Sequence, residues 1–158
     1  MREFVGCDCP HCNDEIGFFE GIGFFHHPDR FNDVEELCNL IDSEEIKHEV
    51  KYLFMNKNAK FYERSYKNTM FVENINYGMR VYYSKHTQEV YNLFYFELKY
   101  LENGKVKIYK PNFKDSSGKR LQQIELNQIG LVPMKCPHCK KLINNDGEFI
   151  PMSMGCWD

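Results

Sequence analysis

The chain has 158 residues and a formal net charge of −3, with 42% hydrophobic and 15% aromatic residues. This composition is typical of a folded globular protein and excludes an intrinsically disordered chain. The small negative charge argues against a protein whose main role is to coat nucleic acid, since such domains are usually strongly basic. No run approaches the ~18 consecutive apolar residues of a membrane span, and no hydrophobic signal region follows Met1. We therefore expect a cytoplasmic protein without membrane contact.

The N-terminal segment, residues 1–27, carries Cys-Asp-Cys-Pro-His-Cys at positions 7–12. An internal repeat follows, in which Ile-Gly-Phe-Phe at 16–19 recurs at 22–25. Glycines beside paired aromatic residues favour a tight hairpin whose rings pack over a small site. The sequence excludes a phosphate loop here, because neither a third glycine at the required offset nor Gly-Lys-Ser/Thr is present.

Residues 29–56 are expected to form two short amphipathic helices. Apolar residues recur at helical spacing in the first of them. Asp42 followed by Glu45 is a capping-box pattern, which predicts the start of the second helix. Cys38 lies on the apolar stripe of the first helix, so we interpret it as a core residue.

From about residue 60 to 128 the sequence alternates Tyr, Phe, Val and Thr with polar residues, which predicts an antiparallel β-meander. The strongest turn signal is Asn103-Gly104, because an Asn-Gly pair fits a type I′ turn between two strands. The helices and the meander together form one α+β region, residues 28–130, inserted before a C-terminal segment, residues 131–158. The expected strands are 60–66, 69–75, 79–85, 89–101, 105–112 and 119–127.

The tetrapeptide Cys-Pro-His-Cys occurs twice, near opposite ends of the chain. A CxxC turn supplies two thiolates from one knuckle of backbone, and two such turns complete the tetrahedral Cys₄ shell that zinc prefers. The usual spacing between two CxxC pairs is about 15 to 20 residues. The far longer separation here is tolerable, because the entropic cost of loop closure grows only logarithmically with loop length. We expect one zinc ion per chain, bound by Cys9, Cys12, Cys136 and Cys139.

Other thiols and imidazoles lie near the two motifs in the sequence. They leave open a second arrangement, in which each end of the chain holds its own ion with additional ligands. His11 and His138 stand inside the tetrapeptides, where we expect their rings to point outward. The further candidate ligands are Cys7, Cys156, His26 and His27.

Both tetrapeptides resemble the knuckles of treble-clef, rubredoxin-like and ribbon proteins, in which Cys-Pro-x-Cys is usually followed by Gly. Asn13 and Lys140 take the place of that Gly here. The first knuckle, the following Gly-Ile-Gly-Phe at 21–24 and the Trp-Asp ending at 157–158 are also similar to small uncharacterised bacterial zinc-ribbon proteins. The resemblance covers only the two chain ends, and it implies zinc binding in a ribbon formed by both.

A redox role is the alternative. Cys-Pro-His-Cys is also the active-site tetrapeptide of disulfide oxidases with the thioredoxin fold, where the His lowers the pKa of a thiol. In that fold the motif begins a helix that follows a first βαβ portion, whereas Cys9 precedes every strand expected here. We therefore favour zinc over a thiol-disulfide oxidoreductase or redox switch.

The motifs favour a binding or regulatory protein over an enzyme. Four thiolates close the zinc shell and leave no position for a catalytic water. The sequence also lacks HExxH, GxSxG and the His-x-Glu element of zinc deaminases. Net charge favours a protein partner, which an exposed apolar patch would indicate. A nucleic-acid-binding ribbon is the second alternative, because basic residues dominate the strip 99–120, and exposed aromatic residues beside it would support that function.

Overall fold

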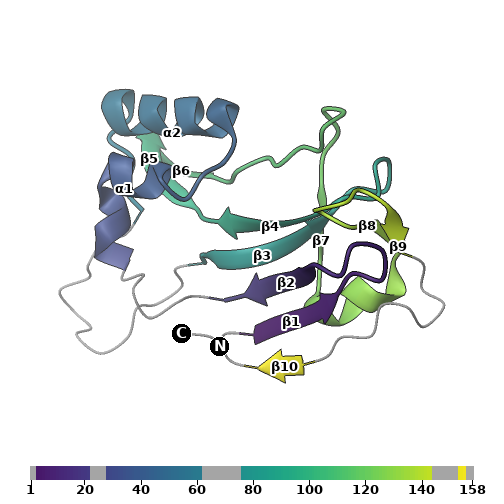
Figure 1. Cartoon of the computed structure of the whole chain (residues 1–158). Helices are drawn as coiled ribbons and strands as arrows, with labels where there is room; N and C mark the ends of the chain where they lie inside the picture. Colours follow the sequence, from purple (N-terminus) through teal and green to yellow (C-terminus); the bar gives the residue numbers. More distant parts are fainter. Residues whose placement is uncertain (1–2, 22–27, 62–75, 144–152, 156–158) are drawn as a thin grey trace. The chain divides into compact units, whose positions relative to one another are not determined.

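The computed structural model describes residues 3–21, 28–61, 76–143 and 153–155 (Figure 1). The chain mixes helices and strands, so the predicted α+β class is confirmed. It forms two compact units: unit 1 comprises residues 1–23, 79–93 and 112–158, and unit 2 comprises residues 24–78 and 94–111. Both chain ends belong to unit 1, and the region expected as an insertion contributes to both units. Among the described residues, no helix is long and apolar enough to cross a membrane.

The first sheet of unit 1 joins the two ends of the chain. Strand β1 (Glu3–Asp8) pairs antiparallel with β2 (Glu15–Glu20) on one side and with β10 (Ser153–Gly155) on the other (Figure 1). The first copy of the aromatic repeat lies in β2, which pairs with β1. Its second copy, 22–25, lies outside the described residues, so the hairpin expected from the repeat stays a prediction.

Two glycines of this hairpin make room for an aromatic ring. Gly6 and Gly17 stand directly opposite each other, and a Cβ on either would come within 2.6 Å of the Phe4 ring. The ring therefore lies against bare backbone of both strands. Phe4 also contacts Phe19, with ring centroids 5.1 Å apart.

The second sheet has the strand order β4-β3-β7, formed by β3 (Gly78–Tyr83), β4 (Val90–Tyr95) and β7 (Gln122–Ile124). An isolated bridge from Gly21 to Met79 links it to β2. The side chain of Asn92 strengthens this link, because its amide accepts from the Phe19 N–H at 2.7 Å and donates to the Phe19 carbonyl at 2.8 Å. The side-chain amide thus acts as a substitute for one residue of a paired strand.

The continuous meander predicted for 60–128 is wrong at two points. The expected strand 89–101 is divided into β4 and β5 (Leu98–Glu102), which belong to different sheets. Burial still alternates through the break, since Phe94, Phe96 and Leu98 are all buried, and so the period-2 pattern concealed the break.

The expected strand 119–127 is shorter in the structure, where only β7 forms, because a 3₁₀ helix, η2 (Leu126–Leu131), begins soon afterwards. Of the expected strands 60–66 and 69–75, residues 62–75 lie outside the described part, while Lys60 forms a bridge with Lys99.

Unit 2 contains a 3₁₀ helix, η1 (Pro28–Asn32), and two α-helices, α1 (Val34–Cys38) and α2 (Glu44–Asn56). The prediction that Asp42 caps the second helix was wrong by one residue. Ser43 is the N-cap, and its hydroxyl accepts from the Ile46 N–H at 3.3 Å. Strands β5 and β6 (Lys105–Tyr109) form a hairpin through Asn103 and Gly104, whose φ values of 53° and 75° confirm the predicted left-handed turn.

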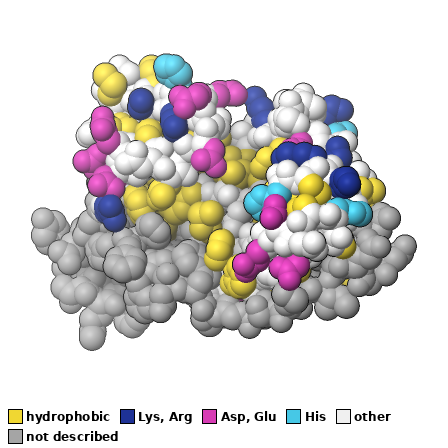
Figure 2. All heavy atoms as spheres, in the orientation of Figure 1, with side chains coloured by type: hydrophobic (Ala, Val, Ile, Leu, Met, Phe, Trp, Pro, Cys, Tyr) yellow, Lys and Arg dark blue, Asp and Glu magenta, His cyan; other side chains and the backbone are white. Residues whose placement is uncertain are grey.

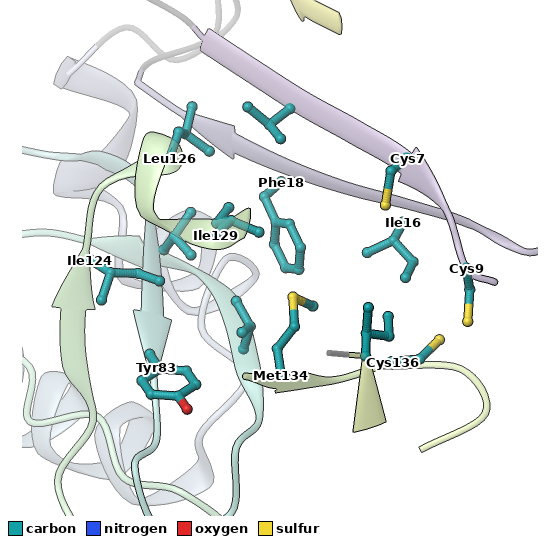
Figure 3. Packing of buried hydrophobic residues seen from close by; sticks show 14 residues of the cluster. Cys7, Cys9, Ile16, Phe18, Tyr83, Ile124, Leu126, Ile129, Met134 and Cys136 are labelled. Atoms are coloured by element: carbon teal, nitrogen blue, oxygen red, sulfur yellow. The ribbon is translucent and has the colours of Figure 1, made fainter. Parts of the chain in front are cut away.

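Each unit has its own buried apolar cluster. In unit 1, side chains from β1, β2, β3, β4, β7, η2, β8 (Met134–Lys135) and β9 (Leu142–Ile143) pack together, with Cys9 and Cys136 at one edge (Figure 3). In unit 2, the ring of Phe31, which is 1% exposed, packs edge-on against Phe61 at 5.1 Å and tilted against Phe94 at 5.5 Å between centroids. Cys38 is buried in α1, as its place on the apolar stripe predicted.

Candidate metal centre

Each Cys-Pro-His-Cys tetrapeptide occupies the turn of a β-hairpin. The first joins β1 to β2, and the second joins β8 (Met134–Lys135) to β9 (Leu142–Ile143). Neither motif stands at the start of a helix, unlike the active-site motif of the thioredoxin fold. Two backbone hydrogen bonds of 2.9 Å close the first turn, from Cys9 N–H to Asp14 and from Asn13 N–H to Cys9. The second turn has the equivalent bonds at the same length, from Cys136 N–H to Lys141 and from Lys140 N–H to Cys136.

The residue after each motif has a left-handed backbone. Asn13 has φ 61° and Lys140 has φ 63°. Glycine adopts positive φ without the steric cost that a side chain adds. Asn tolerates the conformation better than Lys, so the second turn carries more backbone strain than the first.

The two turns face each other and bring four sulfurs together. The Sγ atoms of Cys9, Cys12, Cys136 and Cys139 all lie within 4.8 Å of one another. Two of the separations run between the turns, 3.8 Å from Cys9 Sγ to Cys139 Sγ and 3.9 Å from Cys12 Sγ to Cys136 Sγ. A Zn–S bond of about 2.3 Å in a regular tetrahedron requires sulfurs about 3.8 Å apart. These two separations match that value, and all four sulfurs are close enough together to hold one metal ion.

Backbone N–H groups point at two of these sulfurs. His11 N–H donates to Cys9 Sγ and His138 N–H donates to Cys136 Sγ, both at 3.4 Å. Such bonds stabilise negative charge on a sulfur that ligates a metal. The first cysteine of each motif is also 0% exposed, while Cys12 and Cys139 are partly exposed. The sulfur cluster is thus bounded by the unit 1 core on one side and reaches solvent on the other.

The thiols differ in acidity. Burial opposes ionisation of Cys9, but the N–H groups of Cys12 and His11 outweigh it and lower the pKa of the Cys9 thiol to about 7. Burial raises the pKa of Cys136. At Cys12 the Asp14 backbone favours the thiolate, yet burial and the neighbouring sulfurs together raise the pKa to about 12. A thiolate therefore forms most readily at Cys9, and the positive charge of a bound cation would favour thiolates at Cys12 and Cys136.

The other candidate ligands that the structure describes lie outside the four-sulfur group. Cys7 is buried in β1 outside the four-sulfur group, and burial raises the pKa of its thiol to about 11. The imidazoles of His11 and His138 are exposed and also lie outside the group. His26, His27 and Cys156 fall outside the described residues, as does Trp157.

The two hairpins resemble each other beyond the tetrapeptide. This further similarity was not predicted from the sequence. Ile16 and Ile143 each follow the second cysteine of their motif by four residues, and each is 1% exposed. Cys7 and Met134 each precede the first cysteine by two residues, and both are buried. Apolar residues at equal offsets from both motifs would have indicated this similarity in the sequence. They anchor both hairpins in one core (Figure 3).

A polar cluster beside the second hairpin was also missed. Ser84 and Asp115 are the buried polar side chains among the described residues, and the Ser84 hydroxyl donates to the Asp115 carboxylate at 2.6 Å. The turn that begins at Ser84 continues to Gln88, whose carbonyl accepts from the Lys135 N–H at 2.8 Å. This bond connects the β3–β4 turn to the strand that precedes Cys136. The cluster therefore supports the second knuckle from outside it.

No family model matches the chain, and comparisons with curated proteins and with solved structures give no match either.

Proposed function

We propose that the protein binds one zinc ion per chain through Cys9, Cys12, Cys136 and Cys139, and that the ion serves a structural role in a zinc ribbon formed by the two chain ends. The observation that carries this proposal is the four-sulfur group, whose members lie within 4.8 Å of one another. Four soft thiolates in tetrahedral geometry select zinc, or iron in sites of the rubredoxin type. A cytoplasmic location fits this site, because thiols stay reduced there.

The role of the ion follows from where its ligands come from. Each hairpin supplies two thiolates, so one ion cross-links segments from opposite ends of the chain. Because such a site does not exist in the unfolded chain, the binding free energy of the metal becomes folding free energy. A closed shell of four thiolates leaves no position for a substrate, and this supports a non-enzymatic function.

We further propose that the folded chain is a module that binds another protein. The basic strip expected over 99–120 is divided, since Lys99 to Lys110 belong to unit 2 and Lys114 to Arg120 to unit 1. The face drawn in Figure 2 carries side chains of both charges with apolar side chains among them. Exposed apolar residues on the β5–β6 hairpin, Leu101, Val106 and Ile108, favour a protein partner over nucleic acid.

Native mass spectrometry of protein purified without added metal tests the site, with thiol alkylation after denaturation in parallel. We expect one zinc per chain and alkylation of every cysteine. Replacing either knuckle alone, by Cys9→Ser with Cys12→Ser or by Cys136→Ser with Cys139→Ser, should abolish binding of the same ion. The matched control is Cys38→Ala, a buried cysteine of unit 2, which should keep the ion.

Two results would contradict the shared site. Retention of one ion by each double variant would show two separate sites. A chain without metal, with a pair of cysteines protected from alkylation as a disulfide, would make thiol exchange the better hypothesis.

A further inference from the structure

The β5–β6 hairpin of unit 2 has one outer edge covered by another segment. On the outer edge of β5, Lys60 and Lys99 exchange two backbone hydrogen bonds of 2.8 and 2.9 Å. Lys99 stands directly opposite Ile108 in the hairpin. In an antiparallel pair, opposite residues whose backbone groups do not bond each other both point outward. The N–H and C=O of Ile108 therefore point away from β5, and by alternation so do those of Val106.

Within the described ranges, no residue pairs with the backbone of Val106 or Ile108 on the outward side, so among those residues β6 has an unpaired strand edge. Strand β6 thus presents two N–H donors and two C=O acceptors in the spacing that an added strand would match. The edge runs over five residues, Lys105–Tyr109.

A groove adjoins β6 on the face where Tyr109 points. Its wall is almost entirely apolar and its volume is about 380 Å³. Helix α2 forms one side of the groove, and Tyr109 at the end of β6 forms the other. The Tyr109 hydroxyl donates to the Glu49 carboxylate, which ties the two sides together. The lining residues are His48, Glu49, Tyr52, Leu53 and Tyr109.

The opposite face of the hairpin exposes apolar side chains. Leu101 and Val106 stand opposite each other and are 63% and 67% exposed, and Ile108 is 50% exposed. This stretch is basic, because Lys99, Lys105, Lys107 and Lys110 outnumber Glu97 and Glu102. Of the lysines in the two strands, Lys99 lies on this face, and Lys105 and Lys107 lie on the face of Tyr109. Lys107 pairs with Glu102 at 3.0 Å and Lys110 approaches Glu97 at 3.9 Å, which leaves the basic excess on Lys99 and Lys105.

We propose that β6 and this groove bind an extended segment of a partner protein, in which apolar residues alternate with carboxylates. Successive side chains of an added strand point to opposite faces of the sheet. The apolar residues of the segment would enter the groove beside α2. The Asp or Glu residues between them would lie on the other face, with their methylene groups over Val106 and Ile108 and their carboxylates toward Lys99, which lies on the same face as Ile108. Strand addition beside a helix is an established way to recognise peptides, with affinity from the backbone and specificity from pockets.

This inference rests on the proposed role as a protein-binding module, and it specifies the surface and the chemistry of the partner. The probe is a random dodecapeptide display library, selected on the full zinc-loaded chain, followed by fluorescence anisotropy of synthetic copies of the enriched peptides. We expect enriched peptides to alternate apolar residues with Asp or Glu. Ile108→Pro removes an outward N–H without touching a bond to β5, and it should weaken binding about tenfold or more.

Two further variants separate loss of the edge from loss of the fold. Ile108→Thr keeps the N–H and the β-branched shape, so it should weaken binding much less than the proline. Tyr52→Ala opens the groove at an exposed residue of α2, and it should also weaken binding while β6 remains intact. Zinc content and thermal unfolding of each variant report on the fold.

The proposal is overturned if no alternating pattern is enriched, or if binding is unchanged in both Ile108→Pro and Tyr52→Ala. It is also overturned if sedimentation shows a dimer that Ile108→Pro abolishes, because a second copy would then occupy the edge. A chain that holds zinc but binds no such peptide contradicts this inference alone. A chain that binds the peptides without holding metal contradicts the metal centre alone.

Discussion

His11 and His138 occupy equivalent places, and each ring reaches the backbone of the other hairpin. His11 Nε2 lies 3.0 Å from the Leu142 carbonyl oxygen, and His138 Nε2 lies 3.3 Å from the Glu15 carbonyl oxygen. Each acceptor stands three residues after the second cysteine of its own motif. The repeated tetrapeptide therefore has two uses, because its cysteines converge on one centre while its histidines connect the two hairpins.

These contacts predict a structural effect of the histidines without an effect on metal content. His11→Ala and His138→Ala should each lower the free energy of unfolding by about 0.5–1.5 kcal/mol, the usual value of one hydrogen bond. Each variant should still bind one zinc ion, as measured by native mass spectrometry beside urea unfolding. His48→Ala, in the other unit, is the control. Loss of the ion from either variant would instead make that imidazole a ligand.

The left-handed backbone at Lys140 predicts a stabilising substitution. Lys140→Gly relieves steric strain at φ 63°, and after the entropic cost of glycine we expect a gain of about 0.5–1 kcal/mol. The neighbouring lysine gives a matched control, because Lys141→Gly removes the same side chain where φ is not positive and should lower stability. Chemical unfolding at fixed zinc concentration measures both. Equal destabilisation by the two glycines would contradict the strain at Lys140.

The aromatic cluster of unit 2 predicts a large local loss of stability. Phe31→Ala removes a ring that is 1% exposed and contacts both Phe61 and Phe94, so we expect a loss of about 3–5 kcal/mol. Phe31→Leu should cost less, since it leaves a smaller cavity. Because all the sulfur ligands belong to unit 1, zinc stoichiometry should not change in either variant. Loss of the ion from Phe31→Ala would show that unit 1 does not hold its site without the unit 2 core.

The carboxylate of Asp115 predicts a dependence of stability on pH. Hydrogen bonds from Ser117 and Ser84 hold the pKa of this carboxyl well below its usual value of about 3.9. A depressed pKa stabilises the folded chain fully above the unfolded pKa, and the contribution is lost as pH falls below about 4 toward the folded pKa. Asp115→Asn should therefore be less stable than the parent at pH 6, and the difference should shrink below about pH 4.

Urea midpoints of both proteins, measured from pH 6 to pH 3, check this expectation. Asp8→Asn is the control, because Asp8 is exposed at the end of β1. A difference between parent and Asp115→Asn that stays constant down to pH 3 would contradict the bonded carboxylate.

Much of the candidate site could be predicted from sequence, because its four cysteines lie in short motifs whose geometry depends on neighbouring residues. A CxxC turn encodes its own geometry, so two copies singled out the four cysteines that the structure brings together. The turn at Asn103-Gly104 could be predicted for the same reason, because the Asn-Gly pair alone favours it. The cap of α2 was misplaced by one residue, because Asp42 and Ser43 are both good N-caps and only the hydrogen bond to Ile46 distinguishes them.

The tertiary structure decided what depends on residues far apart in the chain. Alternation of buried residues continued across the break between β4 and β5, so periodicity did not reveal that the two strands belong to different sheets. The pairing of β10 with β1, the reciprocal contacts of His11 and His138, and the division of the basic strip between two units are likewise non-local. By itself the sequence determined which residues suit a metal centre and where turns form, because these follow from short-range conformational preference. Only the tertiary structure decided which strands are neighbours and which edge of β6 lacks a backbone partner in the described part of the chain, because strand pairing depends on contacts that no local pattern encodes.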